Sequence, residues 1–174
     1  MIRVVLTGSE STGKTTLAAR LGAHYGVAAV PEFVREYAAR KDGPLEFNDH
    51  GPIARGQMAV EDEAIARGEP VVIQDTDLLS TVVYCDHYFG ACPPWIIEAA
   101  RARRPDLYLL CEIDLPWVED GVRDRGHMRD DMQNLFRAAV RASGAPTVVI
   151  DGDGEQRLAK AVDAVDQLLL ESRP

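Results

Sequence analysis

Residues 8–15 read Gly-Ser-Glu-Ser-Thr-Gly-Lys-Thr, directly after the apolar, β-branched stretch 2–7. The spacing Gly8-x-x-x-x-Gly13-Lys14-Thr15 matches the Walker A pattern, in which the glycines let backbone N–H groups turn inward around phosphate oxygens. A helix that starts at the end of such a loop adds its partial positive charge. A glycine-rich turn without chemical meaning is the alternative, but the position between a strand and an amphipathic segment favours a nucleotide-phosphate site.

The loop assigns definite roles to two side chains. Lys14 would reach the β- and γ-phosphates of ATP, and the hydroxyl of Thr15 would be a ligand of Mg²⁺. The residues expected to bind the nucleotide phosphates run from the loop into the first helical turn: Gly8, Ser9, Glu10, Ser11, Thr12, Gly13, Lys14, Thr15 and Thr16.

Apolar stretches alternate with amphipathic ones along the whole chain. The pattern predicts strands at 2–7, 27–30, 71–75, 107–111 and 147–150, and helices at 14–25, 32–41, 53–67, 77–89, 94–103, 130–142 and 154–171. Strands that alternate with helices form a parallel sheet covered by helices on both faces, which is a three-layer α/β fold. No internal repeat or linker interrupts the pattern, so a single domain over 1–174 is expected.

The composition of the chain limits which partners and which cell compartment are expected. The chain has 28 acidic and 19 basic residues, which give a formal net charge of -9 and argue against attachment to nucleic acid or membrane. The three cysteines, Cys85, Cys92 and Cys111, form no paired framework and indicate reduced thiols. No apolar run approaches the roughly 20 residues that span a bilayer, and Met1 leads into a strand without a signal-peptide pattern. A cytoplasmic protein is expected.

Three carboxylates lie at or just beyond the ends of predicted strands. Asp75 ends the stretch 71–75 and fits the Walker B carboxylate that would hold the metal, while Asp77 fits this site and a helix cap equally well. Glu32 follows the second predicted strand and is our first candidate for the base that deprotonates a hydroxyl acceptor, with Asp75 the second. In the alternative interpretation, Glu32 only occupies the favourable first turn of a helix.

The polar segment 114–131 carries Arg123, Arg125 and Arg129. An arginine-bearing lid at this position would neutralise the migrating phosphoryl group and exclude water, whereas a solvated charged face is the alternative. The sequence contains no Asn-Lys-x-Asp motif, which counts against a GTPase.

The remaining predictions concern the acceptor and the adenine base. The residues expected to bind the acceptor lie after the second, third and fourth predicted strands: Glu32, Arg35, Tyr37, Asp77, Tyr84 and Trp117. Tyr84 and Trp117 are the aromatic residues expected to stack on a planar ring. The stretch 151–157, with Gly152 and Gly154, suits close approach of an adenine and equally a tight turn.

Four stretches carry a family resemblance: 8–17, Pro31-Glu32-Phe33-Val34-Arg35-Glu36-Tyr37, 75–78 and 114–123. In these stretches the chain resembles the ribosylnicotinamide kinase domain of the NadR family. The resemblance implies ATP- and Mg²⁺-dependent phosphorylation of the ribose 5′-hydroxyl of nicotinamide riboside. It also implies a five-stranded P-loop kinase sheet of order 2-3-1-4-5, and a stand-alone kinase unit without adenylyltransferase or DNA-binding parts.

Two alternatives stay open at this point. One is a kinase for another nucleoside or nucleotide. The other is a nucleotide-dependent switch, a P-loop ATPase that acts through a protein partner. A kinase consumes ATP rapidly only when an acceptor is present, whereas a switch hydrolyses it slowly without one.

Overall fold

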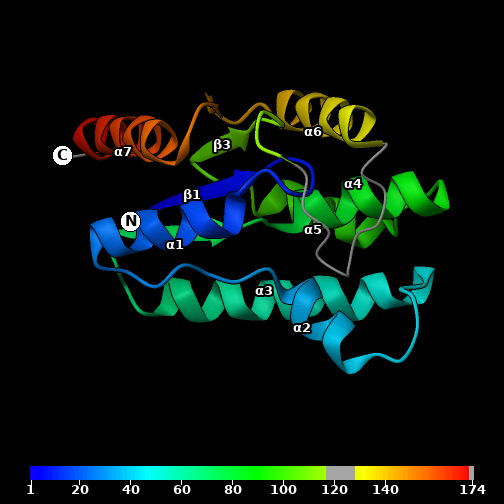
Figure 1. The fold of residues 1–174 in the computed structure, drawn as a ribbon. Helices are drawn as coiled ribbons and strands as arrows, with labels where there is room; N and C mark the ends of the chain where they lie inside the picture. The colour runs from blue at the N-terminus through cyan, green and yellow to red at the C-terminus, as the bar shows by residue number, and fades with distance from the viewer. Residues whose placement is uncertain (117–127, 173–174) are drawn as a thin grey trace.

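The computed structural model describes residues 1–116 and 128–172, which form a parallel sheet with helices on both faces (Figure 1). The elements, in chain order, are β1 Ile2–Thr7, α1 Lys14–Tyr25, α2 Phe33–Arg40, the 3-10 helix η1 Phe47–Asp49, α3 His50–Ala66, β2 Val71–Asp75, α4 Leu78–Phe89, α5 Pro94–Ala102, β3 Leu107–Cys111, α6 Arg129–Ser143, β4 Thr147–Ile150 and α7 Gly154–Glu171.

The sheet has four strands in the order β2-β1-β3-β4, and all neighbours are parallel. β1 is therefore an inner strand, paired in register from Ile2–Val71 to Leu6–Asp75 on one side and from Val4–Leu107 onward on the other. Strands covered on both faces are apolar throughout, which explains the uninterrupted hydrophobic stretches of the sequence. Because the strands are parallel, the loops after β1, β2 and β3 meet at one edge of the sheet.

The predicted five-stranded sheet of order 2-3-1-4-5 is wrong in both strand number and order. The stretch 27–30 forms only an isolated parallel bridge between Val30 and Gln74. The Val30 N–H donates to Ile73 O and the Asp75 N–H donates to Val30 O, both at 2.8 Å. Val30 uses both of its backbone groups toward β2, so the next N–H that could pair with β2 is that of Glu32. Pairing stops there because Glu32 is already the N-cap of α2.

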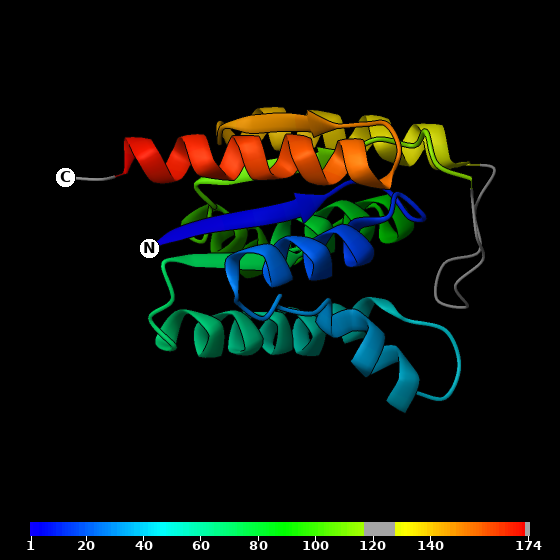
Figure 2. The same cartoon turned by 60° about the vertical axis from the view of Figure 1, so that its left-hand side comes forward.

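The helices lie in two layers (Figures 1 and 2). α1 and α7 pack side by side over one face, where Leu17 and Leu21 meet Val4 and Leu6 in the largest buried apolar cluster. The side chains of β1 alternate, so Val5 points to the opposite face, which α4 and α6 cover.

The start of α3 also differs from the sequence-based prediction. We expected a loop up to Pro52 and a helix from 53, whereas α3 begins at His50. Proline is tolerated in a first helical turn because the N–H it lacks would have no partner within the helix. Among the described residues, no helix is long and apolar enough to cross a membrane.

Leu6 is fully buried in β1, at the centre of the largest cluster. Leu6→Ala is expected to lower the free energy of unfolding by about 2–5 kcal/mol, because it removes buried methyl groups and leaves a cavity. Leu135→Ala is the matched control, since Leu135 on α6 is 41% exposed and its loss should change stability by at most about 0.5 kcal/mol. Chemical denaturation checks both values, and equal losses would contradict this account of the core.

Candidate active site

The phosphate loop, residues 8–13, joins β1 to α1 at the carboxyl edge of the sheet. Its two glycines both have positive φ, +130° at Gly8 and +75° at Gly13. A Cβ at Gly8 would lie 2.6 Å from the carbonyl oxygen of Cys111 at the end of β3, so the loop and β3 approach more closely than any side chain allows. Gly13 is the N-cap of α1 and has no side-chain cap, so the helix N-terminus is open for an anion.

Buried polar groups hold the loop in shape. The ammonium of Lys14 donates to Ser9 O at 2.6 Å, and the hydroxyl of Thr12 donates to the same oxygen at 2.8 Å. On the other side, the Ser9 N–H donates to Gln133 Oε1 at 2.9 Å, and Gln133 Nε2 donates to Cys111 O at 3.0 Å. Gln133 lies on α6 and is fully buried, so it ties the loop to β3.

Asp75, at the end of β2, faces the first turn of α1. The Thr15 hydroxyl donates to Asp75 Oδ2 at 2.6 Å. The other carboxylate oxygen, Oδ1, is buried without a hydrogen-bond partner among the described residues. Burial raises the pKa of Asp75 above its usual value and outweighs the opposing hydrogen bond from Thr15. A hydroxyl beside a carboxylate with an orphaned oxygen is a donor set that fits Mg²⁺, which prefers oxygen ligands.

A cavity of about 380 Å³ opens beside this pair, and Thr15, Glu32, Arg35 and Asp75 are among its lining residues. Glu32 precedes α2, and its side chain is only 4% exposed. Its Oε2 accepts a hydrogen bond from Arg35 Nε at 3.0 Å. The negative charge of Glu32 contributes to the raised pKa of Asp75, so the two carboxylates interact across the cavity. The structure thus brings together residues predicted for the metal, the base and the acceptor.

Three predicted acceptor ligands have other contacts. Asp77 caps α4, because Oδ1 accepts from the Leu79 N–H at 3.0 Å, and its Oδ2 accepts from the Tyr108 hydroxyl at 2.7 Å. The Tyr37 hydroxyl donates to Asp49 at 2.7 Å. Tyr84 stacks on a neighbouring tyrosine of α4 and meets Phe136 edge-on. Of the two roles expected for Asp77, the structure therefore shows the helix cap.

The predicted lid falls largely outside the described residues, and Trp117, Arg123 and Arg125 lie there. Arg129 is described and begins α6. Its Nη1 donates to Leu115 O and its Nη2 donates to Ser11 O, both at 2.8 Å. Arg129 therefore reaches the phosphate loop.

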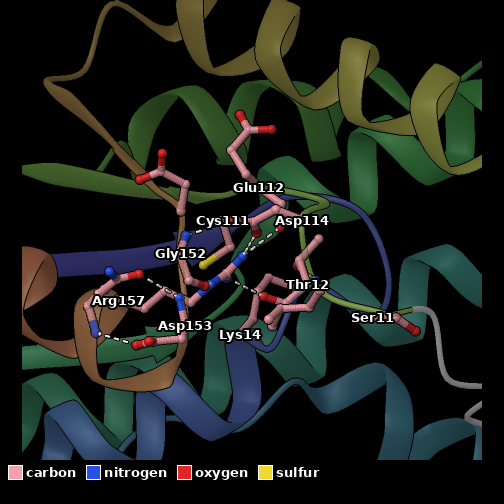
Figure 3. A network of polar contacts seen from close by, with 12 residues as sticks. Ser11, Thr12, Lys14, Cys111, Glu112, Asp114, Gly152, Asp153 and Arg157 are labelled. Carbon is pink, nitrogen blue, oxygen red and sulfur yellow. Dashed lines mark hydrogen bonds and ion pairs between the residues drawn. The ribbon is translucent and has the colours of Figure 1, made fainter.

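The sequence-based prediction missed a buried arginine beside the loop. Arg157 on α7 donates from Nη1 to Thr12 O at 2.7 Å, and Figure 3 shows its contacts. The stretch 151–157, which we proposed for the adenine, thus meets the phosphate loop through its last residue. The available signal was helical spacing, because Arg157, Ala161 and Val165 are all buried and lie four residues apart on α7.

The fold and the loop together define a P-loop phosphotransferase of the kinase class. Its fold matches thymidylate kinase from Ehrlichia chaffeensis with a TM-score of 0.66 at 16% identity, over 96% of this chain and 98% of that one. It also matches a crystal structure of NadR in complex with NR, with a TM-score of 0.78 and 25% identity over 95% of this chain and 50% of that chain.

The family follows from the sequence comparison. The AAA_28 family of AAA domains matches residues 3–157, and the chain belongs to this family. It is homologous to the trifunctional NAD biosynthesis/regulator protein NadR of Escherichia coli (strain K12), with 30% identity over 177 residues, 98% of this chain and 43% of that protein. The Salmonella typhimurium NadR matches at 30% identity over 95% of this chain and 42% of its own length. The chain therefore spans less than half the length of these curated relatives.

Gly8→Ala tests the close approach of the loop to β3. The added methyl group would collide with Cys111 O in a backbone conformation that L-residues rarely adopt, so we expect stability to fall by at least about 3 kcal/mol. Gly26→Ala is the control: its φ is +69° but nothing lies within 4 Å, so only the strain of about 1–2 kcal/mol should appear. Denaturant unfolding compares the stabilities of the two variants. Similar losses of stability would mean that the close approach of Gly8 to Cys111 O is unimportant.

Proposed function

We propose that this chain is an ATP- and Mg²⁺-dependent kinase that phosphorylates the ribose 5′-hydroxyl of nicotinamide riboside. One observation carries the proposal: Glu32 and Asp75 line the same cavity as Thr15 of the phosphate-binding segment, so an acceptor hydroxyl there would lie beside both a base and the phosphates. The homology to NadR, and the structure of that protein with NR, support the choice of acceptor. We further propose that residues 1–174 act as one kinase domain.

In this proposal the triphosphate lies along Gly8–Thr16, with Lys14 on the β- and γ-phosphates. The structure of NadR with NAD and AMP-PNP supports nucleotide binding by this fold. Thr15 and Asp75 would hold Mg²⁺, which, when bound, would offset the negative charge of the phosphate oxygens. The fit rests on the buried Oδ1 of Asp75, which has no hydrogen-bond partner among the described residues.

Glu32 is the proposed general base. Asp75 already accepts the Thr15 hydroxyl at 2.6 Å, which favours its role on the metal side, whereas Glu32 faces the cavity from the beginning of α2. Arg35 donates to Glu32 and orients its carboxylate. The acceptor hydroxyl would pass its proton to Glu32 as its oxygen attacks the γ-phosphorus, and ADP would leave. Arg123 and Arg125 are proposed to neutralise the transferred phosphoryl group from the segment 114–131.

An acceptor panel tests the activity. Purified protein with ATP and Mg²⁺ should convert nicotinamide riboside to its 5′-phosphate, and should consume ATP rapidly only when the acceptor is present. Chromatography of the phosphomonoester and coupled ADP detection measure both. Faster phosphorylation of another nucleoside or nucleotide would reassign the acceptor. Slow hydrolysis without an acceptor, stimulated by a protein, would replace the kinase with a switch.

Glu32→Gln tests the base. The amide keeps the shape of the side chain but cannot take a proton, so turnover should fall by about 10²–10⁴-fold while the acceptor still binds. Glu63→Gln on α3 is the matched control, because Glu63 is exposed and should leave turnover unchanged. Steady-state kinetics with nicotinamide riboside measure the turnover of both variants. Near-normal turnover of Glu32→Gln would make Asp75 the candidate for the general base.

A further inference from the structure

Arg157 is a buried cationic residue that has no role in the proposed phosphoryl transfer. Its side chain is 3% exposed. Nε donates to Gly152 O at 2.8 Å, Nη1 to Thr12 O at 2.7 Å and Nη2 to Glu112 O at 2.9 Å. Nη2 also forms an ion pair with the carboxylate of Asp114. A planar guanidinium with five N–H groups is the side chain that can serve four acceptors in different directions at once.

These acceptors belong to three segments that are distant in the sequence. Thr12 is in the phosphate loop, Glu112 and Asp114 follow β3, and Gly152 lies between β4 and α7 (Figure 3). Two of these segments are also bonded to each other directly, because the Gly152 N–H donates to the second carboxylate oxygen of Asp114 at 2.6 Å. Arg157 and Asp114 therefore join the loop expected near the adenine, the phosphate loop and the start of the segment 114–131.

The contact to the phosphate loop acts on one particular peptide. The Thr12 carbonyl and the Gly13 N–H belong to the same peptide unit, and no peptide of the described chain is cis. In a trans peptide the two groups point in opposite directions, so the bond from Arg157 to Thr12 O directs the Gly13 N–H away from Arg157. A hydrogen bond to the carbonyl also polarises the N–H of the same unit and makes it a better donor.

We propose that Arg157 is a positioning residue of the phosphate site, which holds the Thr12–Gly13 peptide in the orientation that binds nucleotide phosphates. The inference rests on the proposed nucleotide site and deepens it. Because Asp114 and Gly152 share the same guanidinium, Arg157 also ties the orientation of this peptide to the two neighbouring loops. A residue in this role changes nucleotide affinity without touching the acceptor.

The experiment measures binding of AMP-PNP with Mg²⁺ by titration calorimetry, at a temperature at which circular dichroism shows each variant folded. Arg157→Met keeps the bulk of the side chain but removes every donor. If the loop then adopts its binding shape only 1–10% of the time, the Kd should rise about 10- to 100-fold. The KM for nicotinamide riboside should stay within about twofold of the parent value.

Two further variants separate positioning from charge. Arg157→Lys keeps the positive charge but cannot reach four acceptors, so its Kd should remain at least about fivefold above that of the parent. Lys160→Met is the control, because Lys160 is on the same helix and pairs with Asp151 of the same loop, without a described contact to the phosphate loop. Its Kd should equal that of the parent.

Asp114→Asn keeps the test decisive if Arg157→Met does not fold. It removes the ionic partner of Arg157, so the Kd should rise in the same direction by a smaller factor. An unchanged Kd in Asp114→Asn or in a folded Arg157→Met overturns the inference, as does full affinity in Arg157→Lys. Failure of the parent protein to bind AMP-PNP would instead remove the proposed nucleotide site, and this outcome is distinct because it appears before any substitution.

Discussion

The backbone of the phosphate loop has to satisfy its carbonyl groups within the protein while the N–H groups that bind phosphate stay available. An unpaired buried carbonyl is costly, so each one needs a donor. Ser9 O accepts from Lys14 and Thr12, Ser11 O accepts from Arg129, and Thr12 O accepts from Arg157. The phosphate loop therefore depends on two arginines from other helices, Arg129 of α6 and Arg157 of α7, as well as on its own residues.

The sheet and its two helix layers deliver those donors. Parallel strands end at a common edge, and the helices that cover the two faces begin there as well. α6 brings the donor Arg129 from one face, together with Gln133, which accepts from the Ser9 N–H, and α7 brings the donor Arg157 from the other. The close contact of Gly8 with β3 sets the position of the loop between them. The apolar packing and the polar site are thus parts of one arrangement, since moving either helix layer would displace a donor.

Several predictions from the sequence agree with the structure for local reasons. Local sequence patterns predicted the four strands and the loop from Gly8 to Lys14. Each of these features depends on residues that are neighbours in the chain, so the sequence is enough to recognise it. The prediction of a strand at 27–30 was wrong because the stretch meets β2 over one residue only. Val30 pairs with β2 at a single position, because the chain enters α2 directly after Glu32. The sequence allowed Asp77 to be a helix cap or a ligand, and only its contacts with Leu79 and Tyr108 in the structure show that it caps α4.

By itself, the sequence determined the phosphate loop, the alternation of strands and helices and the carboxylate at the end of β2, because each is a pattern of residues close together in the chain. The tertiary structure alone decided which buried polar groups meet. The hydrogen bond from Ser9 to Gln133 joins residues 124 apart, and that from Arg157 to Thr12 joins residues 145 apart. No local spacing encodes such pairs, since they exist only once both helix layers have packed against the sheet.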